Sequence, residues 1–311
     1  MTLKKILYRS ILFLGMLILT DQLVGYILDK KYQSNLCNFA NGEVNEYIKY
    51  KSCDTLFIGS SRVLNMIDPA VLGPKTTNLG KQQKHNYYHT CIVDLLAKNN
   101  KLPKKTLILN LEVCDLFMEN EPSLINQVNS LKYYYTSNEL VQSFINKQGW
   151  QERLKFLSST YRHNSSGLLL VTNSLEGVCL NYPSNGYFPL EPSVYDSIRL
   201  ARSLMEDFDP IVNKRFNNTI FKNISFVKSI CDKNEIQLII IDAPYYKVHP
   251  EYKMASIAIE KYCSKKDIRF IDFKYEKIPG LENKNNWYDN MHTNKNGTKI
   301  YNQYLKQKIY Q

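Results

Sequence analysis

The sequence predicts a three-layer α/β/α protein with a mostly parallel sheet, a helical insertion and an N-terminal transmembrane helix. Three observations lead to this prediction. Short apolar runs alternate with helical patterns beyond Lys31, one long stretch interrupts that alternation, and the chain begins with a basic and then an apolar segment. The 311 residues are 44% hydrophobic and 22% charged, which is the composition of a folded protein and excludes a disordered or fibrous one.

The apolar runs are the predicted strands. They are continuous rather than alternating in polarity, as expected of strands covered on both faces. These runs are residues 55–58 (TLFI), 76–79, 106–111 (TLILNL), 237–241 (QLIII) and 268–271 (IRFI). Helical patterns between or after them cover residues 85–98, 218–234, 250–265 and 294–308. This order favours a parallel sheet wrapped by helices.

The strand spacing lapses between about Cys114 and Arg215, where aromatic and turn residues gather. A loop of this length is uncommon without structure of its own, so we expect a mostly helical insertion over residues 114–215. Its aromatic residues, among them Trp150 and Tyr161, either line a substrate groove or form the insertion's own small core. The second reading is the simpler one.

The segment from Ile6 to Leu28 is a candidate membrane anchor. Its uninterrupted apolar stretch, residues 10–20, is short of the roughly 20 residues that cross a bilayer, so Asp21 has to lie near one interface. A cleaved signal peptide and a soluble or interfacial helix are the alternatives, although no A-x-A-like cleavage site follows. We expect an anchor over residues 1–31 and one α/β domain over residues 32–311.

Charges on both sides of this segment bear on its orientation. Lys4, Lys5, Arg9 and the amino terminus slightly favour a cytoplasmic N-terminus, because positive flanks stay inside. The protein is then a single-pass protein of the cytoplasmic membrane, with its domain on the extracytoplasmic side, periplasmic or outer.

The formal net charge of +11 comes from 40 Lys and Arg against 29 Asp and Glu. Arg is scarce among the positive residues, whereas proteins that read nucleic acid depend on Arg for bidentate contacts. We therefore expect no nucleic-acid partner. A basic surface on a tethered domain still suits anionic headgroups or an acidic polysaccharide.

The seven cysteines are scattered and form no C-x-x-C pair or zinc spacing. His85 and His89 lie four residues apart on a predicted helix and could share a face as metal ligands, but the Glu of an H-E-x-x-H motif and a third ligand are missing. The sequence therefore predicts no metal and no cofactor.

Gly59, Ser60 and Ser61 follow the first predicted strand. A glycine permits a tight turn, and a serine at the start of the next helix stands clear of the sheet at the edge where α/β proteins bind ligands. A serine hydroxyl needs a base to become a nucleophile. By itself a G-S-S turn is a weak signal.

Among the five histidines, His292 stands immediately before the last predicted helix, with Asp289 three residues earlier. On a loop, this spacing lets the carboxylate bond Nδ1 of the imidazole and leaves Nε2 facing a nucleophile. The alternative is a polar helix entry capped by Thr293 or Asn294.

Together, the G-S-S turn after the first strand and D-x-x-H followed by N-x-x-G before the last helix resemble the first and last sequence blocks of the SGNH (GDSL-type) hydrolase superfamily. The form is similar to its membrane-anchored branch, which includes DltD and the alginate O-acetylation proteins. The resemblance covers most of residues 50–311. It implies an SGNH-like fold with Ser61 as nucleophile, His292 as general base and Asp289 as orienting acid.

The resemblance also implies an oxyanion hole made by the N–H groups of Ser61 and Gly80 and the side chain of Asn110. Two positions depart from the family pattern: Ser60 stands where many members have Asp, and the third block reads Leu-Asn-Leu-Glu in place of G-x-N-D. A degenerate oxyanion hole therefore stays open. The resemblance points to no substrate-binding residue.

Three residues after the fourth predicted strand are further candidates. Asp242 is either a second acid or the cap of the turn that follows it. Tyr245 and Tyr246 either stack on a sugar ring or pack in the core, and packing is the simpler expectation.

The combined expectation is a membrane-anchored extracytoplasmic serine enzyme, either an O-acyltransferase or an esterase, that acts on a cell-surface or exported polysaccharide. The transferase reading implies a membrane-bound acyl donor protein as partner. One alternative is a non-catalytic member of the fold that binds glycan or scaffolds a membrane assembly. The other is a soluble cytoplasmic esterase, which requires that the N-terminal segment lie outside the membrane.

Overall fold

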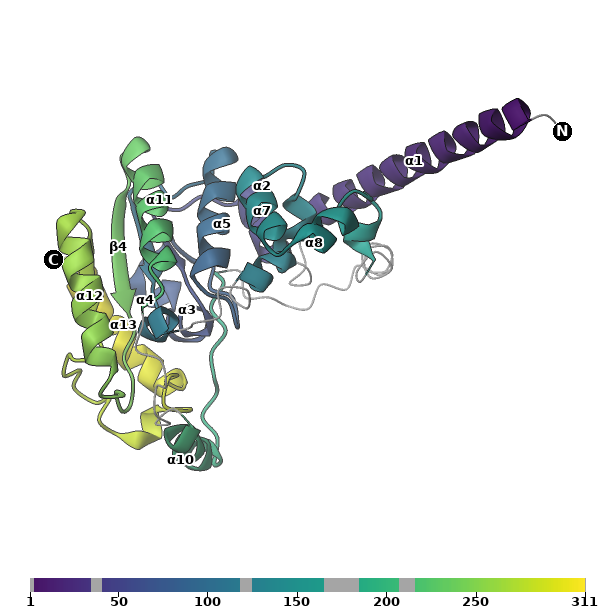
Figure 1. Ribbon diagram of the computed structural model, residues 1–311. Coiled ribbons are helices and arrows are strands. Elements are labelled where there is room, and N and C mark those ends of the chain that lie inside the picture. Colours follow the sequence, from purple (N-terminus) through teal and green to yellow (C-terminus); the bar gives the residue numbers. More distant parts are fainter. Residues whose placement is uncertain (1–2, 35–40, 118–124, 165–184, 207–215, 311) are drawn as a thin grey trace. The chain divides into compact units, whose positions relative to one another are not determined.

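All five predicted strands form one parallel sheet in the computed structural model, which describes residues 3–34, 41–117, 125–164, 185–206 and 216–310 (Figure 1). The strand order is β2-β1-β3-β4-β5. The strands are β1 (Thr55–Ile58), β2 (Thr76–Asn78), β3 (Thr106–Asn110), β4 (Gln237–Asp242) and β5 (Arg269–Asp272). The predicted α/β class is confirmed.

The strand register brings the carboxyl ends of the central strands to one edge of the sheet. Ile58 of β1 pairs with Leu109 of β3, and Asn110, the last residue of β3, pairs with Ile241 of β4. The segments that leave β1, β3 and β4 therefore start side by side. This edge is where a parallel sheet places a ligand site.

One face of the sheet is covered by α3 (Ser61–Met66), α4 (Pro69–Leu72) and α13 (Lys295–Ile309). Phe57, Ile108 and Ile239 of the strands share a buried core with Val63 of α3 and Tyr301 of α13. Burial of such side chains stabilises the fold by roughly 1.5–3 kcal/mol each. This core therefore brings α3, near the start of the sheet unit's sequence, into contact with α13 at its end.

Other helices connect the strands from β2 to β5. They are α5 (Asn86–Lys98), α11 (Thr219–Lys233) and α12 (Tyr252–Lys265), and α5 and α11 pack side by side (Figure 1). Right-handed crossovers from β2 to β3, β3 to β4 and β4 to β5 all advance in one direction, which assigns these helices to the face opposite α3 and α13. The result is the predicted three-layer arrangement.

Contacts divide the chain into two compact units. The sheet unit consists of residues 50–127 and 182–311, and the helical unit of residues 1–49 and 128–181. Within the sheet unit, η2 (Val113–Phe117) follows β3, α10 (Asp196–Glu206) precedes α11, and η5 (Lys284–Asn286) precedes α13. The domain boundary that the sequence predicts after residue 31 stays a prediction.

The helical unit contains α1 (Leu3–Ser34), α2 (Gly42–Tyr50), η3 (Gln127–Tyr134), α7 (Glu139–Lys147), α8 (Trp150–Lys155) and η4 (Tyr161–His163). Its aromatic residues pack on one another: the Tyr32 ring lies 4.1 Å from Tyr133, and Tyr135 lies 4.6 Å from Phe156. The described part of the predicted insertion is therefore largely helical. Its residues 118–124, 165–184 and 207–215 lie outside the described residues.

Helix α1 is long and apolar enough to cross a membrane, judged by length and composition. Its side chains are mostly exposed, from Leu3 to Leu19, with only 11% of its most apolar window buried. A signal sequence near the N-terminus meets the same criterion.

Candidate active site

The turn after β1 presents Ser61 at the first position of α3. A side chain on Gly59 would come within 2.4 Å of Val63 and 2.9 Å of Asn110, so only glycine fits there. Ser60 caps the helix, its Oγ accepting the Arg62 N–H at 3.2 Å. Because Ser61 is in the first helical turn, its own N–H has no acceptor inside the helix.

The loop before α13 presents His292. A bridge between Trp287 and Thr293 closes this loop, and the Tyr288 N–H donates to the His292 carbonyl at 2.9 Å. The Asn294 side chain caps α13 by accepting the N–H groups of Asn296 and Gly297. Asn294 is therefore the cap of the last helix, as one interpretation of this motif predicts. This cap leaves the His292 side chain free for a chemical role.

Ser61, His292 and Asp289 form one continuous hydrogen-bonded chain. Ser61 Oγ lies 2.8 Å from His292 Nε2, and His292 Nδ1 lies 2.9 Å from each carboxylate oxygen of Asp289. With Nδ1–H donating to the carboxylate, Nε2 is free to accept the Ser61 proton. The side chains of His292 and Asp289 are 17% and 24% exposed, so a substrate has access to them.

The Asp289 carboxylate is held in its charged form. Its Oδ1 also accepts the backbone N–H groups of Met291 and His292, both at 2.8 Å. Burial acts to raise the pKa of Asp289, but the hydrogen bonds and the charge of His292 outweigh burial and lower that pKa below its ordinary value. A charged carboxylate at this position orients the imidazole.

Asn110, the last residue of β3, lies against the same turn. Its Oδ1 accepts the Ala243 N–H at 3.1 Å, which directs Nδ2 the other way. That Nδ2 is buried and has no hydrogen-bond partner among the residues that the structure describes. A buried amide donor without an acceptor is costly in a folded protein. Asn110 is thus available as a donor to a bound oxyanion.

Gly80 has a packing role that the sequence did not reveal. A side chain there would meet the Leu64 backbone at 2.3 Å, so glycine lets the segment after β2 lie against α3. The Gly80 N–H donates to Asn78 Oδ1 at 2.7 Å. An oxyanion would have to compete with that acceptor, and the predicted role of Gly80 as a donor stays a prediction.

Ser60 and Glu112 form a second contact at the turn, which sequence reasoning missed. The Ser60 hydroxyl donates to Glu112 Oε1, and both residues are buried. The glutamate follows β3 as Ser60 follows β1, and the two strands are neighbours. The hydroxyl of Ser60 is therefore engaged, whereas that of Ser61 faces His292.

Asp242 is part of a buried ion cluster rather than a second catalytic acid. Its carboxylate binds Arg62 Nη1 at 2.8 Å and Lys274 Nζ at 2.7 Å, and it accepts the Val113 N–H at 3.2 Å. All three charged side chains are fully buried. Asp242 thus holds Arg62, the residue that follows Ser61, at the end of β4. The sequence singled out Asp242 after the fourth strand but not its partners Arg62 and Lys274.

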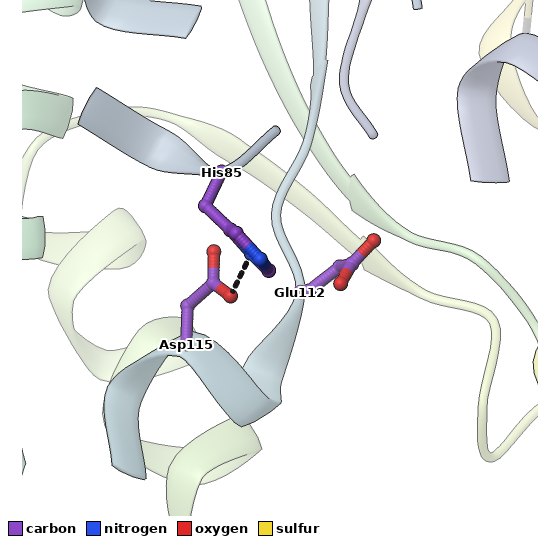
Figure 2. A group of neighbouring side chains, drawn as sticks. All are labelled: His85, Glu112 and Asp115. Atoms are coloured by element: carbon purple, nitrogen blue, oxygen red, sulfur yellow. Dashed lines mark hydrogen bonds and ion pairs between the residues drawn. The ribbon is translucent and has the colours of Figure 1, made fainter. Parts of the chain in front are cut away.

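His85, Glu112 and Asp115 come together, as Figure 2 shows. Their ligand atoms all lie within 4.8 Å of one another, and this donor set suits a divalent cation. In this structure His85 Nδ1 and Asp115 Oδ1 form a hydrogen bond of 2.6 Å. The group is therefore a hydrogen-bonded pair of half-buried His85 and buried Asp115 beside buried Glu112.

His89 does not share this group with His85. Its Nε2–H donates to the Lys84 carbonyl at 3.1 Å, and burial lowers the pKa of His89 to about 3. The imidazole is therefore neutral and directed at its own helix entry.

Tyr245 and Tyr246 both pack against neighbours. The Tyr245 ring is buried and lies 4.1 Å from the Arg62 guanidinium, so it is inaccessible to a sugar. Tyr246 lies 5.9 Å from the Trp287 ring at the edge of a pocket that Lys277 and Glu282 also line. The Tyr246 N–H donates to the Asn290 carbonyl at 2.9 Å, next to Asp289 in the chain.

No protein-family model matches the chain, and no curated protein matches it either. A presumed acylhydrolase from Bacteroides fragilis covers 88% of this chain and 97% of its own, at 11% identity and a TM-score of 0.44. A presumed platelet activating factor from Streptococcus pneumonia covers 97% and 99%, at 11% identity and a TM-score of 0.37. Structural similarity at this level does not establish a family for this chain.

Proposed function

We propose that this protein is a serine enzyme of acyl esters, with Ser61 as nucleophile, His292 as general base and Asp289 as the acid that orients it. The observation that carries the proposal is the hydrogen-bonded chain from Ser61 Oγ through His292 to Asp289, with distances of 2.8 and 2.9 Å. Nucleophile, base and orienting group in hydrogen-bond contact are the geometry that activates a serine.

The proposed reaction has two steps. Ser61 Oγ attacks the acyl carbonyl carbon while His292 Nε2 takes the hydroxyl proton, and the carbonyl oxygen becomes an oxyanion. Asn110 Nδ2 and the Ser61 N–H are the donors proposed for that oxyanion. Collapse of the intermediate expels the alcohol, which takes the proton from His292, and leaves the acyl group on Ser61.

The acceptor in the second step determines the class of enzyme. Water or a sugar hydroxyl gives its proton to His292 and attacks the acyl carbon of the acyl-Ser61 ester. The Ser61 oxygen then leaves and takes that proton back from His292, and the product is a free acid or a new ester. We propose a cell-surface or exported polysaccharide as the acylated substrate, with α1 as a membrane anchor and the sheet unit on the extracytoplasmic side. In the transferase direction, a membrane-bound acyl donor protein supplies the acyl group.

The ester content of the polysaccharide tests this proposal. Cells that produce the wild type are compared with cells that produce Ser61→Ala at equal protein levels. Lower acylation in the variant identifies a transferase, and higher acylation identifies an esterase. Equal ester content in the two strains contradicts a polysaccharide substrate. The matched control is Ser229→Ala, which removes an exposed serine hydroxyl on α11 and should behave as the wild type.

A second candidate is a non-catalytic glycan-binding or scaffold protein of the same fold. The observation that favours it is the Gly80 N–H, which already donates to Asn78 at 2.7 Å and so leaves one fewer donor for an oxyanion. Glycan binding that Ser61→Ala leaves unchanged, together with no turnover of any ester by the wild type, would support this candidate.

A further inference from the structure

Helix α8 of the helical unit presents a row of large apolar side chains to solvent. Trp150, Leu154 and Leu157 are 67%, 53% and 73% exposed, and we call these three residues the α8 ridge. Their spacing of four and three residues puts them on one side of a helical path. The Leu157 N–H continues that path by donating to the Leu154 carbonyl at 3.1 Å.

The ridge is not the core-facing side of α8. Phe156 is the residue of this segment that points inward, where it is buried against the Tyr135 ring. Helix α8 itself has no buried residue, and the segment reaches the core of the helical unit only through Phe156, directly after the helix, while the ridge faces out. Exposed large apolar side chains in a row mark a contact surface.

The residues that follow the ridge are bonded to α1. The Asp21 carboxylate accepts the Ser158 hydroxyl at 2.6 Å, the Ser159 N–H at 2.7 Å and the Thr160 N–H at 3.1 Å. Ser159 Oγ also donates to Gln22 at 2.8 Å. Leu157 thus lies directly before residues 158–160, which are bonded to α1 at Asp21. Asp21 is the residue at which the uninterrupted apolar stretch of α1 ends.

This attachment sets the depth of the ridge. The part of α1 from Leu3 to Thr20 has 18 residues, which rise about 27 Å along a helix, close to the roughly 30 Å of a bilayer's hydrocarbon core. Lys4, Lys5 and Arg9 lie in the first two turns of this part, where long basic side chains reach back to the headgroups of the opposite interface. Asp21 then lies at the boundary between hydrocarbon and headgroups. Its bonds to residues 158–160 place the end of α8 at the same boundary.

The chemistry of α8 suits that boundary. Tryptophan is enriched at the membrane interface because its ring is apolar and its N–H is polar. Arg153 lies on α8 beside the ridge, and Lys147 ends the preceding α7. Such basic side chains attract anionic headgroups.

We propose that the α8 ridge inserts into the interfacial layer of the membrane that α1 spans, as a second contact with the phospholipid surface. This inference rests on the proposed anchoring by α1. A helix that crosses the bilayer alone leaves its attached unit free to rotate about the helix axis. A second contact at the interface holds the helical unit in one orientation on the membrane.

Bromolipid quenching of Trp150 tests the proposal on the full chain. The protein has two tryptophans, and Trp287 is 1% exposed with its Nε1–H bonded to the Leu281 carbonyl, so it serves as an internal background. The chain is reconstituted in phosphatidylcholine and phosphatidylglycerol vesicles with brominated acyl chains. In the wild type, we expect about half or more of the Trp150 emission to be quenched. In Trp150→Phe, we expect the bromolipid to quench no comparable part of the emission.

A matched probe controls for position on the helix. Lys155 lies about 140° around the helix from Trp150, so Lys155→Trp in the Trp150→Phe background should be quenched far less. Trp150 emission that resists bromolipid but is quenched by aqueous iodide overturns the ridge proposal. A chain that does not float with vesicles overturns the anchor and the ridge together, so the two failures are distinguishable.

Discussion

Ser61 Oγ and His292 Nε2 lie 2.8 Å apart although 231 positions separate the two residues in the chain. The contact exists because α3, which begins at Ser61, and α13, which follows His292, share one buried core through Val63 and Tyr301. The pair therefore depends on the packing of the last helix on the sheet. The predictions below concern this pair and the residues that hold it.

Replacing Asp289 by Asn should lower kcat roughly 10⁴-fold toward a small activated ester such as p-nitrophenyl acetate. The Asn oxygen can still accept the N–H groups of Met291 and His292, so the loop is kept. Its NH₂ group, however, favours the wrong tautomer of the imidazole. Steady-state kinetics with circular dichroism as the folding control measure this effect. A kcat within tenfold of the wild type contradicts the orienting role.

Replacing Asn110 by Asp should lower kcat by roughly 10²–10³ because the oxyanion loses a donor. The Asp variant keeps an oxygen for the Ala243 N–H, whereas Asn110→Ala leaves that buried group unpaired and costs a further ~1–3 kcal/mol of stability. Comparing kcat and the free energy of unfolding for both variants separates the two roles. An Asp variant as active as the wild type would exclude Asn110 from the oxyanion hole.

Replacing Arg62 by Met should lower the free energy of unfolding by about 3–5 kcal/mol, because it removes one partner from a fully buried ion cluster. Arg62→Lys keeps the charge but loses the forked bonds to the Ala243 and Pro244 carbonyls, so it should be milder. Chemical denaturation followed by Trp287 fluorescence gives both values. A loss below about 1 kcal/mol for Met contradicts the anchoring role of Arg62.

His85 should make stability depend on pH. Burial acts to lower the pKa of His85, but the hydrogen bond and charge of Asp115, with Glu112, raise it above 6.5. Because the folded-state pKa exceeds the unfolded value, the stabilisation is complete below about pH 6.5 and is lost as pH rises through the folded pKa. The Tm difference between the wild type and His85→Gln should shrink from about pH 6 to pH 9.

Asp115→Asn is the matched control for this pH effect, since it removes the carboxylate and leaves the imidazole in place. Its Tm difference from the wild type should follow the same pH course. A Tm difference that stays constant or grows with pH in either variant contradicts the assignment.

The sheet could be predicted because each strand is a continuous apolar run. The strand Thr55–Ile58 is where TLFI predicts it, and the predicted third strand, residues 106–111, is one residue longer than β3. Helix α13 could be predicted because Asn294 is a strong cap before an amphipathic pattern. Local signals of this kind report on local structure.

The hydrogen-bonded chain could be anticipated only where residues stand in a recognisable pattern, as His292 and Asp289 do. The cluster of Arg62, Asp242 and Lys274 could not, because its first pair is separated by 180 positions and has no periodic signal. The same holds for Ser60 and Glu112, which meet because their strands are neighbours. Contacts between residues on neighbouring strands depend on the order of the strands in the sheet. The spacing of residues along one sequence does not give that order.

Labelling with a fluorophosphonate probe, which reacts only with an activated serine, is the most direct test of the proposed chemistry. The account predicts that the folded wild type is labelled on Ser61, that Ser61→Ala and His292→Ala lose the label, and that Ser229→Ala keeps it. Peptide mapping by mass spectrometry locates the adduct. A folded wild type that stays unlabelled, or a Ser61→Ala variant labelled as strongly as the wild type, would contradict Ser61 as the nucleophile.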